Sequence, residues 1–356
     1  MLDRIIEKNE LLELMDELSR ERTIIGPVAR EDRYFYEVVK KVRELDLGFN
    51  YGVYGPRAFL FPPTETLFRF TVQDGSFTAT PVLEHQSQAF VGVHPCDVHA
   101  IRLLDRVFSR EHRDEHYLAR RAATLIVGID CPKECTPGVF CADMKSNSAD
   151  EGFDLMCYPL NGNAEQQASA RAEHTTYGVV FGTQTGREWL LYRQVGRAPS
   201  VSDERAFKQY QQAKEQAFTR RIPYDVDTLP GLLDRSYDSL LWEATARRCY
   251  SCGSCNLSCP TCYCFNVYDE SDLSLVSGER KREWDGCQLT TFALVAGGHN
   301  FRAKAASRLR HRIYRKGKWV REREGLSGCV GCARCDRACT AKINSVEIYN
   351  QLSEEV

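Results

Sequence analysis

Two copies of one cysteine pattern constrain this chain more than any other feature. Residues 249–260 read CYSCGSCNLSCP and residues 329–340 read CVGCARCDRACT, so the spacing C-x2-C-x2-C-x3-C occurs twice. In two-cluster bacterial ferredoxins, the first three cysteines of such a run hold one 4Fe–4S cluster, and the fourth ligates the other cluster. The sequence therefore predicts two 4Fe–4S clusters, one held by Cys249, Cys252, Cys255 and Cys339, the other by Cys329, Cys332, Cys335 and Cys259.

Zinc is the alternative, because structural zinc sites close with four ligands, typically in pairs of C-x2-C. Two complete copies of the four-cysteine run favour iron and sulfide. The 69 residues between Cys259 and Cys329 exceed the spacer of compact bacterial ferredoxins. We therefore expect an all-α, helical ferredoxin-type domain over residues 233–356, in which the arrays cap helices and the spacer packs around them.

The composition is that of an ordinary globular protein. Of 356 residues, 43% are hydrophobic and 27% charged, with a formal net charge of −2. At about 150 residues per domain, we expect two domains, over residues 1–232 and 233–356. The start, MLDRIIEKNE, resembles no secretory signal, and no run reaches the roughly 18 apolar residues of a transmembrane helix. We therefore expect a cytoplasmic protein with neither nucleic acid nor membrane as a partner.

The N-terminal domain is predicted to be mixed α/β. AFVGVHPCDVHAIRLLDRVF indicates a strand over 89–93 and a helix over 97–108, and ATLIVGID indicates a strand over 123–130. Apolar residues spaced among charges predict a helix over 31–46. EWLLYR, residues 188–193, is interpreted as a further strand.

Four cysteines follow the first two of these strands. Adjacent strands of an α/β sheet would place HPCD and CPKECTPGVFC at one crevice, where such sheets bind ligands. A third iron–sulfur cluster is one interpretation, and a zinc site or ordinary loop cysteines are the alternatives. The candidate ligands of this third site are Cys96, Cys131, Cys135 and Cys141.

The remaining cysteines are predicted to pack. Eight thiolates complete two clusters, which leaves Cys262 and Cys264 in CPTCYCF and Cys287 in REWDGC. Buried cysteine commonly behaves as a small hydrophobe, and we expect the same of Cys157 in the core.

The spacer between the arrays is strongly basic. Residues 302–323 contain ten Lys and Arg against one acid, Glu322. A solvated helix face is the ordinary interpretation of such a run. The alternatives are docking to an acidic partner and raising the potential of a negatively charged cluster.

Taken together, these segments resemble the iron–sulfur beta subunits of cytosolic NiFe sulfhydrogenases and the corresponding iron–sulfur subunits of anaerobic sulfite reductases. They also resemble the iron–sulfur subunits of heterodisulfide-reductase-type complexes. The resemblance implies a protein without flavin or NiFe centre, placed between a flavoprotein subunit that binds FAD and NAD(P) and a catalytic partner. The segments that carry it are HPCD, CPKECTPGVFC, CYSCGSCNLSCPTCYCF, REWDGC and CVGCARCDRAC.

The leading hypothesis is therefore a non-catalytic electron-transfer subunit of a multi-subunit oxidoreductase. Its catalytic partner would be a hydrogenase, a sulfite reductase or a heterodisulfide-reductase module. The chain has neither a G-x-G-x-x-G nor a G-x-x-x-x-G-K-[ST] run, so nucleotide binding is expected on a partner. The alternative is a self-contained reductase of sulfur compounds with its active site at the Cys96/Cys131 crevice.

Overall fold

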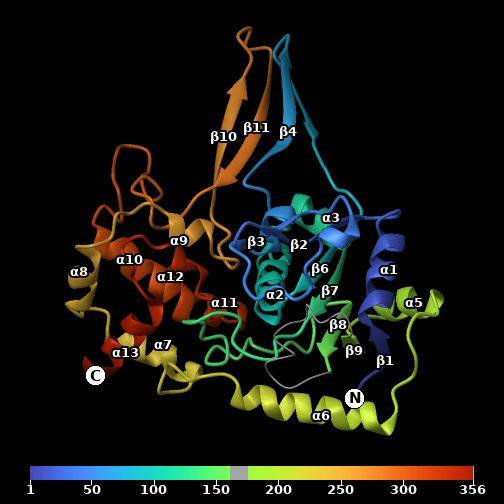
Figure 1. The fold of residues 1–356 in the computed structure, drawn as a ribbon. Coiled ribbons are helices and arrows are strands. Elements are labelled where there is room, and N and C mark those ends of the chain that lie inside the picture. The colour runs from blue at the N-terminus through green and yellow to red at the C-terminus, as the bar shows by residue number, and fades with distance from the viewer. Residues whose placement is uncertain (161–174, 356) are drawn as a thin grey trace.

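The computed structural model describes residues 1–160 and 175–355. Figure 1 shows a sheet domain, a helical body beside it that contains the C-terminus, and a narrow second sheet that projects from between them. Within the described ranges, no helix combines the length and the apolar character needed to cross a bilayer.

The larger sheet has seven strands in the order β1-β9-β8-β7-β6-β2-β3. The central strands β2, β6, β7 and β8 run parallel, and the outer pairs are antiparallel. Every residue of β6 and β7 is buried, as is typical of parallel strands covered on both faces. The strands are β1 (Arg4–Glu7), β2 (Thr23–Arg30), β3 (Arg33–Val38), β6 (Gln88–Val93), β7 (Thr124–Ile129), β8 (Leu155–Pro159) and β9 (Thr176–Phe181).

Alternating side chains of this sheet enter two separate cores. Leu125 and Val127 of β7 pack on the side of α1, whereas Ile126 packs with residues of α2 and α3 on the other side. The sheet domain also contains several helices. They are α1 (Lys8–Leu18), α2 (Pro95–Ser109), α3 (Glu115–Ala122), α5 (Gln184–Tyr192) and α6 (Val201–Gln216).

The strand over 89–93 and the helix over 97–108 are confirmed as β6 and α2. The helix predicted over 31–46 is wrong, because Glu31 adopts a left-handed φ of 55° in the β2–β3 turn and RYFYEV continues as β3. The strand predicted over 188–193 is also wrong. Thr183 caps the helix α5 there by accepting a hydrogen bond from the Gly186 amide at 3.0 Å.

The helical body packs around one core. Leu233, Trp242, Tyr314 and Tyr349 meet there, and Phe140 from the N-terminal half joins them. Its helices are α7 (Leu229–Arg235), α8 (Leu241–Ala246), α9 (Ser254–Leu257), α10 (Ala305–Tyr314), the π-helix η4 (Arg315–Trp319), α11 (Val320–Glu324), α12 (Arg334–Ala338) and α13 (Ser345–Glu355).

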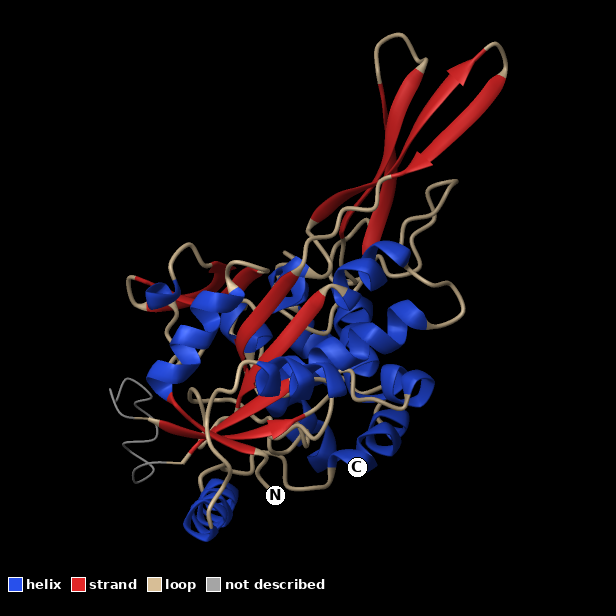
Figure 2. Ribbon diagram, turned by 90° about the vertical axis from the view of Figure 1, so that its right-hand side faces the viewer, coloured by secondary structure: helices blue, strands red, loops and turns tan. Residues whose placement is uncertain are grey.

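The expectation that the C-terminal domain is all-α is not confirmed, because residues 265–284 form a hairpin. Its strands join a four-stranded sheet in the order β10-β11-β4-β5, which Figure 2 shows projecting from the body. A two-stranded hairpin is marginally stable alone, and pairing of β11 with β4 makes one sheet from both halves of the chain. The strands are β4 (Thr64–Gln73), β5 (Ser76–Pro81), β10 (Phe265–Ser271) and β11 (Ser277–Trp284).

Candidate metal centres

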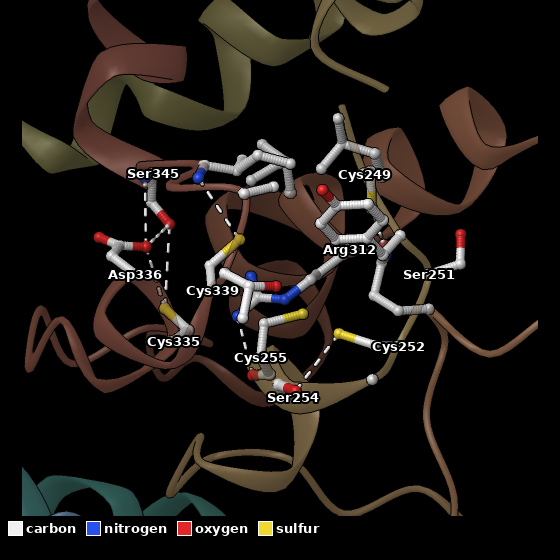
Figure 3. Close-up of a pocket in the computed structure, with 18 of the residues that line it drawn as sticks. Cys249, Ser251, Cys252, Ser254, Cys255, Arg312, Cys335, Asp336, Cys339 and Ser345 are labelled. Atoms are coloured by element: carbon white, nitrogen blue, oxygen red, sulfur yellow. Dashed lines mark hydrogen bonds between the residues drawn. The ribbon is translucent and has the colours of Figure 1, made fainter. Parts of the chain in front are cut away.

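The first predicted set of cysteines surrounds a cavity of about 50 Å³ at the start of α9. Cys249, Cys252 and Cys255 come from the first array, and Cys339 comes from the end of the second. Figure 3 shows the sulfurs of Cys252, Cys255 and Cys339 turned toward the space between them. Gly253, with a φ of 76°, lets the array turn sharply into α9.

The second predicted set lines a neighbouring cavity. Cys259, Cys329, Cys332 and Cys335 border it, and Cys335 borders the first cavity as well. Each array therefore sends its fourth cysteine to the other set. The structure brings the eight candidate ligands together in the two groups of four that the sequence predicts, side by side in one helical body.

Backbone amides already point at some of these sulfurs. The Gly331 amide donates to Cys329 Sγ at 3.4 Å, and the Ile343 amide donates to Cys339 Sγ at the same distance. Hydrogen bonds to ligating sulfurs are one means by which a protein sets the potential of an iron–sulfur cluster.

The N-terminal cysteines lie at one edge of the large sheet, against the second array. Because β6 and β7 are parallel neighbours, Cys96 in the first turn of α2 and Cys131 after β7 share that edge. The Phe140 amide donates to the Gly331 carbonyl oxygen at 2.8 Å. A Cβ on Gly331 would lie 2.5 Å from the backbone of Phe140 and Cys141. The cysteine-bearing loop therefore packs directly on the array.

Packing brings three of these four thiols together, because Cys131 and Cys135 line one cavity and Cys135 packs with Cys141 and with Ala333 of the second array. Burial raises the pKa of Cys131 well above its usual range, and the neighbouring Cys135 and Cys141 contribute to the rise. Burial also raises the pKa of Cys135 to about 11 and that of Cys141 to about 12. Burial raises the pKa of Cys96 well above its usual range, and Asp97, Cys332 and Cys141 add to the rise. Cys131, Cys135 and Cys141 therefore lie together against the second array, and Cys96 lies at the same edge of the sheet.

A buried ion pair joins the two sites. Arg334, between Cys332 and Cys335, binds both carboxylate oxygens of Asp97, with Nη2 at 2.7 Å from Oδ2. The two side chains are 3% and 1% exposed. Arg334 Nε also donates to the Gly52 carbonyl oxygen at 3.0 Å. The second array is therefore anchored to the residue that follows Cys96.

Part of the basic stretch is not a solvated face. Arg308, Arg312 and Lys316 are buried at intervals of four along α10 and η4. Arg312 borders both cluster cavities, and Lys316 borders the second. The sequence analysis considered residues 302–323 together and did not single out these three buried cations. Their spacing of four residues indicates that they share one face of a helix.

Arg312 is placed to face an anion. Burial by itself lowers its pKa, but the surrounding thiols Cys255, Cys335 and Cys259 outweigh that effect and raise the pKa well above its ordinary value. Its Nη2 donates to the Cys255 carbonyl oxygen at 3.2 Å, while its buried Nε lacks an acceptor among the described residues. An unsatisfied buried donor costs about 1–3 kcal/mol, and a sulfide-bearing cluster would supply the acceptor.

A single metal ion fits the thiols less well than a cluster. Nowhere in residues 1–160 and 175–355 do three or more His, Cys, Asp or Glu side chains converge closely enough to bind one ion. Zinc requires four ligands around one centre, with each sulfur at about 2.3 Å. A four-iron cluster instead binds each thiolate at a separate iron. The cysteines around it are therefore spread over the walls of a cavity, as they are in the two sets described above.

Comparison with known proteins agrees with this chemistry. Residues 248–343 match the family model described as a 4Fe-4S dicluster domain. Over 344 residues, the chain is 31% identical to sulfhydrogenase 2 subunit beta of Pyrococcus furiosus, and the match covers 96% of each chain.

Proposed function

Because this chain belongs to the family of sulfhydrogenase beta subunits, we propose that it is the electron-transfer subunit of a multi-subunit oxidoreductase. It would relay electrons between a flavoprotein subunit that binds FAD and NAD(P) and a catalytic subunit. The name of the relative favours a hydrogenase as that catalytic partner, ahead of a sulfite reductase or a heterodisulfide-reductase module. The reducing cytoplasm, which keeps thiols free, is the proposed location.

One observation carries this proposal: the two sets of four cysteines occupy adjoining cavities that share Cys335. Two 4Fe–4S clusters bound there would supply one-electron carriers in close succession. Cys249, Cys252, Cys255 and Cys339 would hold one, and Cys259, Cys329, Cys332 and Cys335 the other. Between them, Arg312 would stabilise the negative charge that each cluster gains on reduction.

We also propose that Cys96, Cys131, Cys135 and Cys141 hold a third cluster. The cavity shared by Cys131 and Cys135 and the packing of Cys135 with Cys141 support this assignment, as does the position of Cys96 at the same edge of the sheet. Such a cluster would extend the electron path from the helical body to the edge of the large sheet.

The alternative, a self-contained reductase at this crevice, is less well supported. The thiolate is the nucleophilic form of cysteine, and burial raises the pKa of Cys96 and Cys131 well above the usual range. Buried thiols with a raised pKa stay protonated at neutral pH unless a metal binds them, because metal ligation deprotonates cysteine. They therefore suit a metal site better than a nucleophilic one.

The test is anaerobic purification from the native source, with identification of bound subunits and measurement of iron, zinc and acid-labile sulfide per chain. We expect a flavoprotein and a catalytic partner, about eight irons for the two C-terminal clusters, and about four more for the third. NAD(P)H should reduce the clusters only when the flavoprotein is present. Zinc in place of iron, or reduction of a sulfur compound by the isolated chain, would contradict the proposal.

A further inference from the structure

We propose that Cys262, Cys264 and Cys287 hold a further iron–sulfur cluster beside the two of the helical body. The three thiols border one cavity. Its volume is about 10 Å³, the same as that of the cavity lined by Cys259, Cys329, Cys332 and Cys335. The inference goes beyond the proposed function but rests on it, because it assumes that the eight cysteines of the arrays hold their own clusters.

The β10–β11 hairpin brings these thiols together. Cys262 and Cys264 follow directly after the first array, and Cys287 follows β11. The hairpin register pairs Phe265 with Trp284, and the Asp285 amide donates to the Cys264 carbonyl oxygen at 3.1 Å. The chain thus returns to its starting point, and the cysteines flanking the hairpin meet at its base.

A buried asparagine orders two of the three sulfurs. Asn256 Nδ2 donates to Cys262 Sγ at 3.7 Å and to Cys287 Sγ at 3.5 Å. Asn256 Oδ1 accepts from the Gln288 amide at 3.2 Å. A Cβ on the neighbouring Gly286 would lie 2.7 Å from this Oδ1, so glycine leaves room for the asparagine. Amide donors on sulfur are what ligating thiolates receive in iron–sulfur proteins.

Three cations face the same cavity. Arg312, Arg315 and Lys316 border it, and in the described part of the chain none of them lies within 4.0 Å of a carboxylate oxygen as an ion pair. Lys316 Nζ donates to Thr261 Oγ1 at 2.7 Å, and Arg312 Nε has no acceptor there. An uncompensated buried charge costs several kcal/mol. Arg312 and Lys316 would also face the cluster of the second set. The half-buried Arg315 borders this cavity and neither of the other two, so a thiolate-bound cluster here would supply its counter-charge.

The geometry also fixes the number of protein ligands. The described lining of the cavity includes three thiols and neither a fourth cysteine nor a histidine or carboxylate. One iron of a four-iron cluster would therefore carry solvent or another small ligand. The Cys262 amide also donates to the Cys259 carbonyl oxygen at 3.3 Å, which ties Cys262 to the second cysteine set, so Cys264 and Cys287 give the cleaner test.

The experiment uses the full chain in its anaerobically purified complex. The variants are Cys264→Ser and Cys287→Ser, and the matched control is Cys157→Ser, a fully buried cysteine on β8 in the sheet core. We expect each test variant to lose one EPR signal of the reduced protein. Each should also lose about three to four irons per chain, because that is the iron content of one such cluster. The control should keep the wild-type iron, sulfide and spectrum.

Cys329→Ser and Cys131→Ser are measured in parallel. The first tests the cluster of the second set and the second tests the N-terminal cluster, so a failure of the proposed function can be told apart from a failure of this inference. Wild-type iron, sulfide and EPR spectra in both Cys264→Ser and Cys287→Ser would show that these thiols only pack. A second measurement needs no variant. Mild anaerobic oxidation of the wild-type protein should release the iron that lacks a thiolate and give the EPR signal of a three-iron cluster. Absence of that signal overturns the proposal even where the variants do not fold.

Discussion

The buried pair of Arg334 and Asp97 gives a test of how the helical body is held against the sheet domain. Arg334 lies inside the second array, and Asp97 lies beside Cys96 of the N-terminal set. Their side chains are 3% and 1% exposed, so water cannot replace either partner. We expect Arg334→Met and Asp97→Leu each to weaken both the fold and the N-terminal metal site.

The magnitude follows from the geometry. At the 2.7 Å between Arg334 Nη2 and Asp97 Oδ2, two unit charges attract by about 6 kcal/mol in a medium of effective dielectric constant about 20. Desolvation of both groups cancels most of that attraction. Removing one partner leaves the other charged and buried, which costs about 3–5 kcal/mol. Replacing both with apolar residues leaves no unpaired buried charge. The double variant should therefore lose far less free energy of unfolding than the two single variants lose together.

Urea unfolding under anaerobic conditions measures these costs, followed by tryptophan fluorescence and by loss of the cluster absorbance. The double-mutant cycle gives the coupling between the two residues. The exposed pair of Arg280 and Asp269, also bonded at 2.7 Å, provides the control, and its removal should leave the urea midpoint unchanged. Single variants that unfold at the wild-type midpoint, or costs that simply add, would refute the reasoning.

Further predictions concern individual residues. Cys259→Ser should abolish the EPR signal of the cluster held by the second array, and Cys339→Ser that of the first; the reverse pattern would contradict the exchange of fourth ligands. Gly331→Ala places a Cβ at a φ of 61° and 2.5 Å from the packed loop, so iron analysis should show up to about four irons lost from the N-terminal set. Arg312→Gln should lower the potentials of both neighbouring clusters in redox titrations, whereas Arg312→Lys should retain most of the wild-type values. Burial lowers the pKa of His311 from 6.5 to about 4, so the folded state binds fewer protons than the unfolded state and stability falls as the pH falls through that window. Urea midpoints of His311→Gln should therefore fall less than wild type between pH 7 and pH 5.

The fold was predictable where the apolar residues follow one clear pattern along the sequence. The continuous apolar runs of β6 and β7 identify buried strands, and the helical spacing after Pro95 identifies α2. The hairpin over residues 265–284 was not predictable in the same way. β10 is mostly exposed and β11 is rich in charged residues. The hairpin pairs with β4, some two hundred residues earlier, which no local pattern reveals.

The grouping of the eight array cysteines was predictable because the ferredoxin spacing itself encodes the exchange of the fourth ligand. The surroundings of those cysteines were not. The contact between Arg334 and Asp97 and the packing of Phe140 on Gly331 join segments about two hundred residues apart. Neither shows any signal in the local sequence.

The long spacer between the arrays therefore packs around the candidate metal centres and is more than a linker. It contributes the hairpin that pairs with β4, the cysteine Cys287, and the buried row of Arg308, Arg312 and Lys316. The spacer buries positive charge against thiols of both arrays. Because a nearby cation favours the reduced, more negative form of a cluster, we expect this segment to raise the potentials of clusters bound there without any change of ligands.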